Sequence, residues 1–186
     1  LYSLRLYQYF SQKKFDLVGI TLDMGLFHPD TEELKKFCYA NQIDYRVVET
    51  KIGNIVFEAR NESNPCSLCS NLKRGALHNA AIAANCNKVA LGHHFDDVLE
   101  TLMMSLLYES RFNTFSPLTY MERKNIYVIR PMVYASEMEI IGAVKRHNLP
   151  VFKSGCPADG TTKRQEMKDD VKLIIKKYPH FKERVL

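Results

Sequence analysis

The sequence predicts an α/β fold: a doubly wound, mostly parallel sheet with helices on both faces. Two observations support this. Short apolar runs of strand length alternate with longer segments of helical period almost throughout the 186 residues. Polar and cysteine-containing segments also follow three of the apolar runs directly, where doubly wound sheets bind their ligands. We expect a single domain over residues 1–186, because this length buries one substantial core and no linker or repeat interrupts it.

The elements are expected in alternating order. Predicted strands lie at residues 15–23, 44–50, 88–92, 125–131 and 150–154. Predicted helices lie at residues 1–10, 28–42, 53–63, 72–85, 93–108, 136–148 and 161–177. The helix at 28–42 has Asp30 or Thr31 as its expected N-cap and acidic residues in its first turn. We expect polar loops at 64–70 and 116–124. Because the first helical pattern is already under way at Leu1, we also expect further chain upstream.

Composition narrows the class of protein. The 26 basic and 21 acidic residues give a net charge of +5, which favours an anionic partner such as RNA. No run approaches the length of a membrane span and the first residues contain no signal-peptide core, so we expect a cytoplasmic protein without a membrane partner. The five cysteines are an odd number and include one C-x-x-C pair, which favours metal or redox use over structural disulfides.

The cysteines are the first candidate site. Cys66 and Cys69 form the C-x-x-C pair, a spacing that suits zinc, an iron–sulfur cluster or a dithiol switch. Cys156 follows the last predicted strand and is the expected third ligand. Three thiolates can hold three irons of a 4Fe-4S cubane and leave the fourth iron open, or hold a 3Fe-4S cluster, whereas structural zinc needs a fourth ligand. Cys38 lies within a predicted helix and Cys86 at the end of one, and both are expected to be ordinary buried or half-buried residues.

The segment Gly92-His93-His94-Phe95-Asp96-Asp97 is the second candidate site, at a predicted strand-to-helix junction. Its side chains suit a divalent metal, and the amides of the helix N-terminus suit phosphate oxygens. The structural alternative is that Asp96 or Asp97 caps the helix. We expect at most one of the two adjacent histidines to reach a shared site.

Three segments together carry a family resemblance: PCSLCSNLKRGAL, KVALGHHFDDVLETL and YVIRPM. The chain resembles the tRNA 2-thiocytidine synthetase (TtcA) group of the PP-loop ATPase superfamily over nearly its whole length. The resemblance implies a PP-loop, or adenine nucleotide alpha hydrolase-like, fold. It also implies a glycine-rich phosphate loop, which with the first strand would precede Leu1. At Cys156 the family usually has a second C-x-x-C, of which this chain retains only the first cysteine.

The resemblance also implies an activity. Family members use ATP and magnesium to adenylate a base carbonyl, C2 of cytidine in this group, and then replace its oxygen with sulfur delivered through a 4Fe-4S cluster. By this resemblance Cys66, Cys69 and Cys156 would hold the cluster. Nucleotide contacts would fall on Asp23, Met24, Gly92, His93 and Asp96. Phosphate contacts to tRNA are expected from Lys73, Arg74, Lys163, Arg164 and Lys168, whose alternative role is a solvated helix face.

The partners and alternatives follow from the same resemblance. A sulfur donor such as a cysteine desulfurase is expected, with a homodimer as one assembly to test. A second hypothesis is a PP-loop sulfurtransferase acting on another tRNA base or on a small molecule. A third, of a different class, is a nucleotide-binding module stabilised by zinc or a cluster and without catalytic turnover.

Overall fold

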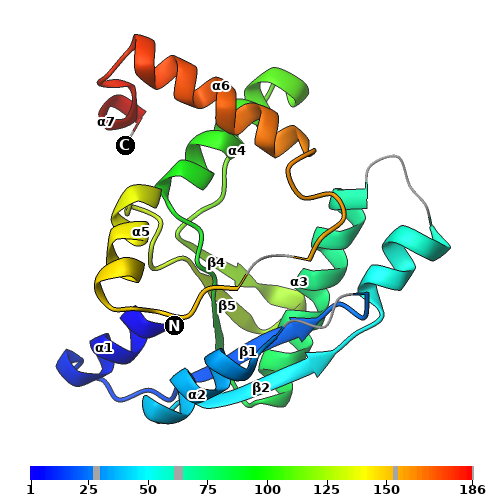
Figure 1. Cartoon of the computed structure of the whole chain (residues 1–186), viewed down its shortest axis with the longest axis vertical. Helices are drawn as coiled ribbons and strands as arrows, with labels where there is room; N and C mark the ends of the chain where they lie inside the picture. Colours follow the sequence, from blue (N-terminus) through cyan, green and yellow to red (C-terminus); the bar gives the residue numbers. More distant parts are fainter. Residues whose placement is uncertain (27–29, 61–64, 153–154, 186) are drawn as a thin grey trace. The chain divides into compact units, whose positions relative to one another are not determined.

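The computed structural model describes residues 1–26, 30–60, 65–152 and 155–185. The chain divides into two compact units, which are described separately. Unit 1 comprises Leu1–Cys86 and Leu149–Cys156, and unit 2 comprises Asn87–Asn148 and Pro157–Leu186. Figure 1 shows the course of the chain. No helix in the described ranges is both long and apolar enough to cross a membrane.

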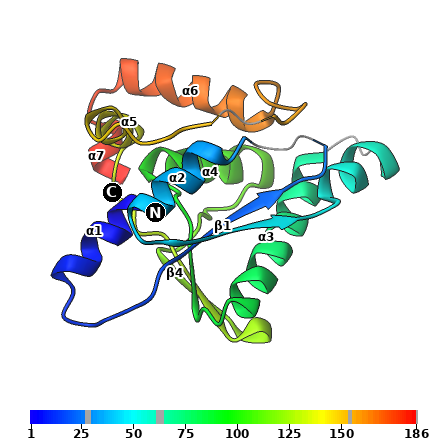
Figure 2. The same ribbon diagram turned by 60° about the horizontal axis from the view of Figure 1, so that its bottom comes forward.

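Unit 1 is built on two parallel strands, β1 (Val18–Asp23) and β2 (Asp44–Glu49), which pair from Val18 opposite Asp44 to Asp23 opposite Glu49. Helix α2 (Glu32–Ala40) connects them, and α2 and α3 (Pro65–Ala83) lie on opposite faces of the strand pair (Figures 1 and 2). This confirms the predicted parallel βαβ arrangement with helices on both faces. The two strands end at the same edge, so the residues that follow Asp23 and Glu49 lie together.

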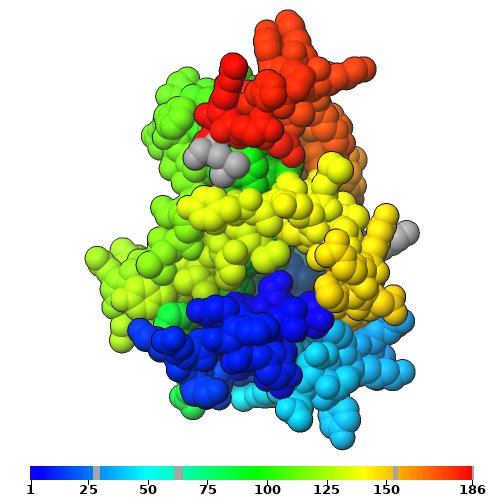
Figure 3. All heavy atoms as spheres, turned by 90° about the vertical axis from the view of Figure 1, so that its left-hand side faces the viewer, coloured from blue at the N-terminus to red at the C-terminus, as the bar shows by residue number. Residues whose placement is uncertain are grey.

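Helix α1 (Tyr2–Phe10) lies beside α2 at the surface of unit 1 (Figure 3). The ring of Tyr2 packs edge-on against Phe37 with 6.1 Å between centroids. Thr31 is the N-cap of α2, as expected, but the capping acceptor is Asp30, whose Oδ1 accepts the Glu32 N–H at 3.1 Å. Residues 28 and 29 of the predicted helix lie outside the described residues.

Helix α3 begins at Pro65, seven residues before the predicted helix start at residue 72, so the prediction of a loop at 64–70 is wrong over its described part. Pro65 opens the helix, because its ring presets a helical φ and its missing N–H is not needed at the first position. Cys66 and Cys69 therefore lie within the first turns of α3. A π-helical turn, η1 (Asn54–Ala59), precedes it and corresponds to the predicted short helix at 53–63, whose last residues fall outside the described ranges.

Unit 2 contains a three-stranded sheet in the order β3 (Lys88–Ala90), β5 (Ile126–Ile129), β4 (Leu118–Met121). Strands β3 and β5 are parallel, and β4 adds to the edge in antiparallel orientation. Strand β4 lies in the segment predicted as a polar loop. As an edge strand it is half-exposed, and it is held by ladder bonds and by the Tyr120–Tyr127 ring contact, which only the partner strand supplies.

The helices of unit 2 are α4 (Phe95–Glu109), α5 (Glu137–Arg146), α6 (Lys163–Lys177) and a short α7 (Phe181–Val185), with a 3₁₀ turn η2 at Glu122–Lys124. Its core joins α4 to α6 through the buried side chains Phe95, Leu99, Met167 and Val171. The predicted helices at 93–108, 136–148 and 161–177 are thus confirmed, whereas α7 lies beyond the last predicted element.

The strand predicted at 150–154 is wrong over its described part. Pro150, Val151 and Phe152 carry no strand structure, and residues 153 and 154 lie outside the described residues. Val151 is 71% exposed and Phe152 is 45% exposed, so this apolar run is not covered as a buried strand would be. The argument that Cys156 follows a strand end therefore fails, and its placement has to rest on its contacts.

Candidate functional site

The carboxyl end of β1 forms a fixed turn at Asp23-Met24-Gly25. The buried Asp23 side chain accepts the Gly25 N–H through Oδ1 at 2.9 Å. The Asp23 carbonyl oxygen accepts the Thr50 N–H at 2.9 Å and the Thr50 hydroxyl at 2.7 Å. Gly25 has a φ of +83°, a conformation that side-chain-bearing residues rarely adopt. The predicted nucleotide position at Asp23 and Met24 is thus a rigid turn tied to the end of β2.

Met24 brings this turn to the cysteine pair. It packs against an apolar cluster whose buried members are Ile52, Val56 and Cys69. The two cysteines differ in environment, since Cys69 is 8% exposed while Cys66 is on the surface. Three residues apart on α3, they lie on one face of the helix. The structure therefore places one predicted cluster ligand and one predicted nucleotide contact in the same part of unit 1.

Cys156 belongs to the same unit and interacts electrostatically with Cys69. The pKa of the Cys69 thiol is raised, first by burial and then by the nearby thiols of Cys156 and Cys66, while Lys73 acts in the opposite direction. A thiolate beside two other thiols is unfavourable unless a cation compensates it. Cys66 and Cys156 thus both act on Cys69 electrostatically, although the strand argument that suggested Cys156 was wrong.

The remaining cysteines are ordinary in their surroundings, as predicted. Cys38 is fully buried on α2, and burial raises the pKa of its thiol. Cys86 is half-buried after the end of α3, where its thiol donates to the Ala84 carbonyl at 3.7 Å. All five cysteines lie in the described ranges and none forms a disulfide. Among described residues, no three His, Cys, Asp or Glu side chains lie close enough to hold one metal ion as they stand.

The start of α4 in unit 2 is closed by a capping box. His94 is the N-cap: its Nδ1 accepts the Asp97 N–H at 3.3 Å, and Asp97 Oδ2 accepts the His94 N–H at 2.9 Å. The alternative that Asp96 or Asp97 caps the helix is confirmed for Asp97, which caps it from the third helical position while His94 is the N-cap residue. An acid three residues after a capping residue is a recognisable signal, but histidine is an unusual first partner.

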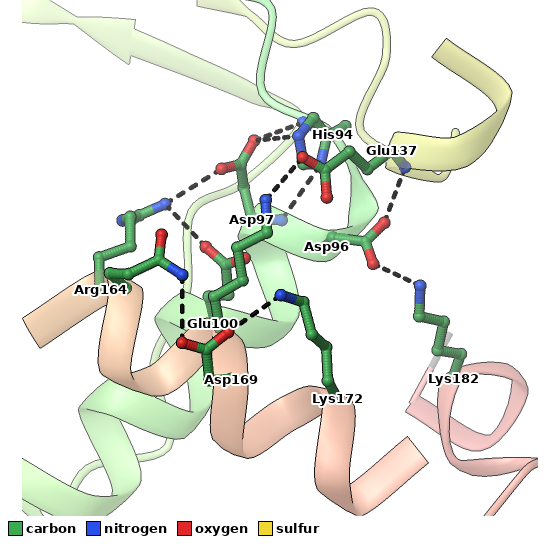
Figure 4. Close-up of polar contacts among 11 residues, drawn as sticks. His94, Asp96, Asp97, Glu100, Glu137, Arg164, Asp169, Lys172 and Lys182 are labelled. Carbon is green, nitrogen blue, oxygen red and sulfur yellow. Dashed lines mark hydrogen bonds and ion pairs between the residues drawn. The ribbon is translucent and has the colours of Figure 1, made fainter. Parts of the chain in front are cut away.

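Asp96 has both carboxylate oxygens engaged within unit 2. Its Oδ2 accepts the Glu137 N–H at 2.8 Å, and its Oδ1 pairs with the Lys182 ammonium of α7 (Figure 4). Burial by itself disfavours the charged carboxylate, but these bonds outweigh it and the pKa of Asp96 is lowered. In this structure Asp96 connects α4 to α5 and α7.

His93 and Gly92 are the members of the segment with the fewest internal contacts. The His93 ring stacks on Phe115 with 4.8 Å between centroids, and its Nδ1 is buried with no hydrogen-bond partner. Burial is the main reason that the pKa of His93 is lowered, so the ring is neutral near pH 7. Gly92 is exposed, and a side chain there would meet nothing within 4 Å. The two histidines thus differ in their contacts, since His94 caps α4 and the His93 ring stacks on Phe115.

The predicted tRNA contacts separate into two groups. Lys73 and Arg74 are exposed on α3. On α6, Lys163 pairs with Glu166 at 2.9 Å and Lys168 pairs with Glu137 at 2.6 Å. Arg164 donates to Asp97 Oδ1 and to the Thr101 hydroxyl, each at 3.1 Å, and lies 3.5 Å from Glu100 Oε2 (Figure 4). Sequence reasoning missed Glu100 and Glu137, because each was one acid among many on a helix.

Comparison with known proteins identifies relatives of this chain. The tRNA-cytidine(32) 2-sulfurtransferase of Pelobacter propionicus is 34% identical over 175 residues, which are 92% of this chain and 65% of the relative. The enzyme of the same name from Geobacter sulfurreducens is 32% identical and covers 93% of this chain and 68% of its own. This chain thus spans about two thirds of the length of these relatives.

A solved structure is similar over nearly the whole chain. It is a U34-tRNA thiolase, NcsA, from Methanococcus maripaludis with its 4Fe-4S cluster. The TM-score is 0.80 at 27% identity, and the match covers 98% of this chain and 63% of the other. A family model described as a PP-loop domain matches residues 3–171. Since this match and the relatives cover most of the sequence, the chain belongs to the PP-loop domain family.

Proposed function

We propose that this protein is an ATP-dependent tRNA sulfurtransferase that thiolates C2 of a cytidine through an iron–sulfur cluster held by Cys66, Cys69 and Cys156. The observation that carries the proposal is the position of Cys69, which belongs to the apolar cluster that Met24 packs against, while Cys66 and Cys156 contribute to the raised pKa of its thiol. Because one family model spans residues 3–171, across both units, we further propose that they form one domain.

The donor set fits an iron–sulfur cluster better than zinc. The three proposed cysteine ligands all lie in unit 1, and iron–sulfur clusters are held by thiolates, whereas a structural zinc site takes four protein ligands. Burial is the main reason that the pKa of Cys69 is raised, and a bound cation would favour its thiolate form, so cluster binding and thiol deprotonation favour each other. The exposed Cys66 and Cys156 leave the open side of such a cluster accessible to a sulfur species.

The chemistry explains why ATP is needed. The base carbonyl oxygen attacks the α-phosphate of ATP, and pyrophosphate leaves. Sulfur then attacks the same carbon, and the C–O bond breaks with AMP as the leaving group. When bound, the cluster would supply an open iron for the sulfur. Asp23 and Met24, with Gly92, His93 and Asp96, are the proposed nucleotide residues. Mg²⁺ would offset phosphate charge as the first bond forms.

We propose that Lys73 and Arg74 contact tRNA phosphates. They are exposed on the helix that carries the cysteine pair, so a contact there would bring the RNA backbone close to the cluster. Lys163 is also a candidate, since its pair with Glu166 is solvent-exposed on both sides and a phosphate could replace the carboxylate. A cysteine desulfurase as sulfur donor, a homodimer and a cytoplasmic location stay predictions.

A second candidate function is thiolation of a tRNA uridine. It is favoured by the structural similarity to the thiolase named for U34, while the relatives with higher identity are named for cytidine 32. The identity of the base would be decided by nucleoside mass spectrometry of tRNA from a deletion strain. Loss of 2-thiocytidine alone supports the first candidate, loss of a 2-thiouridine supports the second, and unchanged thionucleosides would refute both.

Anaerobic purification with iron, sulfide and zinc analysis tests the cluster itself. We expect iron and acid-labile sulfide in stoichiometric amounts. Zinc at one atom per chain with no labile sulfide would instead support a zinc-stabilised module, and the iron–sulfur mechanism would be abandoned. Supplying the deletion strain with the wild-type gene should restore the missing thionucleoside, which connects the chemical loss to this protein.

A further inference from the structure

Three cations of the C-terminal helices reach acidic groups at the start of α4 and α5, all within unit 2 (Figure 4). These pairs join Arg164 to Asp97, Lys168 to Glu137, and Lys182 to Asp96. Each joins helices distant in sequence, and Arg164 lies 67 residues from Asp97. By contrast, the α6 pairs Lys163–Glu166 and Lys172–Asp169 join neighbours on one helix.

Burial distinguishes the two kinds of pair. The carboxylates that face the first group are 14% exposed in Asp96, 20% in Asp97 and 35% in Glu137. Arg164 also lies over Glu100, whose side chain is only 5% exposed. In the helix-surface pair of Lys172 and Asp169 the exposures are 63% and 59%. The pairs between helices are therefore screened less by solvent and salt, and their charges are already matched inside the protein.

A chain of contacts leads from these pairs to the segment proposed to meet the nucleotide. Arg164 holds one oxygen of Asp97, and the other oxygen of Asp97 accepts the His94 N–H in the capping box. His94 is directly preceded by Gly92 and His93. Asp96, held by Lys182 and the Glu137 N–H, fixes the same helical turn from the side of α5 and α7.

We propose that Arg164, Lys168 and Lys182 are positioning residues that form a clamp on the first turns of α4 and α5 and so hold Gly92 and His93 toward the nucleotide. Because their charges are already paired with partly buried carboxylates, we expect them not to contact tRNA phosphates. The inference rests on the proposed function, since it assumes that the segment meets ATP. It assigns to the C-terminal helices an effect on nucleotide binding.

The test compares Arg164→Met and Lys182→Met with the control Lys172→Met in the intact protein. Methionine keeps most of the side-chain length and removes the charge, and Lys172 forms an exposed pair with Asp169 within α6. The first measurement needs no ligand: amide hydrogen exchange over residues 92–98. We expect faster exchange in both clamp variants and wild-type exchange in the control.

Kinetics and tRNA binding complete the test. We expect the KM for ATP to rise roughly tenfold in the clamp variants with a smaller change in kcat, a cost typical of removing a supporting residue. Arg164→Lys should restore the KM for ATP only in part, because lysine lacks the two guanidinium nitrogens that donate to Asp97 and Thr101. Affinity for tRNA should keep the wild-type dependence on salt.

Each alternative outcome is distinct. Arg164→Met could leave amide exchange unchanged and reduce the slope of tRNA affinity against salt by the equivalent of about one phosphate contact. Arg164 would then be an RNA contact, and the clamp would be refuted. If the wild type thiolates tRNA and the clamp variants match it in KM, the inference alone fails. If the wild type does not use ATP, the proposed function fails. The link from the clamp to the nucleotide then fails as well, even if amide exchange over residues 92–98 is faster in the clamp variants.

Discussion

Replacing Cys66 and Cys69 by alanine, one at a time, separates a ligand role from a packing role. Both residues lie on the same face of α3, but Cys66 is exposed and Cys69 is 8% exposed within the cluster of Ile52 and Val56. If both bind the cluster, each change should abolish cluster retention and thiolation to the same extent. Their effects on the fold of the cluster-free protein should differ.

The size of that difference follows from burial. An exposed side chain that makes no special contact changes the free energy of unfolding by less than about 0.5 kcal/mol when truncated. Removing the buried Cys69 sulfur loses apolar burial comparable to a methylene group, about 1 kcal/mol once the small cavity is included. We therefore expect Cys66→Ala to unfold like the wild type in denaturant and Cys69→Ala to be less stable by about 1 kcal/mol.

The assay measures iron and acid-labile sulfide per chain after anaerobic reconstitution, beside urea unfolding of the cluster-free protein. Cys156→Ala should lose the cluster as completely as the C-x-x-C variants. Cys86→Ala is the matched control, since Cys86 is half-buried in the same unit and its thiol bonds to the Ala84 carbonyl. The ligand assignment is wrong if Cys66→Ala retains wild-type iron, or if Cys86→Ala loses as much iron as Cys156→Ala.

Three further predictions concern the supporting structure. Leu99→Ala removes a fully buried side chain between α4 and α6 and should lower the free energy of unfolding in urea by about 3 kcal/mol. Leu107→Ala, at an exposed position, should lower it by less than about 0.5 kcal/mol. Equal effects would contradict the core assignment. Gly25→Ala should destabilise the protein by at least about 1 kcal/mol, because Gly25 has a φ of +83° and the new Cβ would lie 2.6 Å from the Thr50 carbonyl oxygen. Gly75→Ala should be neutral or stabilising, because a Cβ there meets nothing within 4 Å. Burial is the main reason that the pKa of Glu100 is raised, so the folded state favours its neutral form and the wild type loses stability as pH rises from the unfolded value of about 4.3. Glu100→Gln removes this titration, so its thermal stability relative to the wild type should improve between pH 4 and pH 7; a difference that is constant or falls over this range would refute the sign.

Local signals in the sequence account for most of the fold. The parallel pair β1–β2 and the helices α2, α4, α5 and α6 were predictable, because each combines an apolar period with residues suited to its ends. The failures have local causes too. Cys66 lies in a polar run whose helical state depends on Pro65 at the first position, and β4 is a half-exposed edge strand with a weak pattern of its own.

The sequence by itself determined which residue types occupy the site: the C-x-x-C pair, the GHHFDD segment at a strand-to-helix junction and the turn at Asp23. Spacing along the chain is enough for these, since neighbours within one turn of helix or one loop stay together. Only the tertiary structure decided that Cys69 is the buried member of the C-x-x-C pair and lies in the cluster that Met24 packs against. It also decided that Arg164 and Lys182 form ion pairs with Asp97 and Asp96. The physical reason is distance along the chain: burial and ion pairing between residues tens of positions apart depend on how helices pack, which no local pattern records.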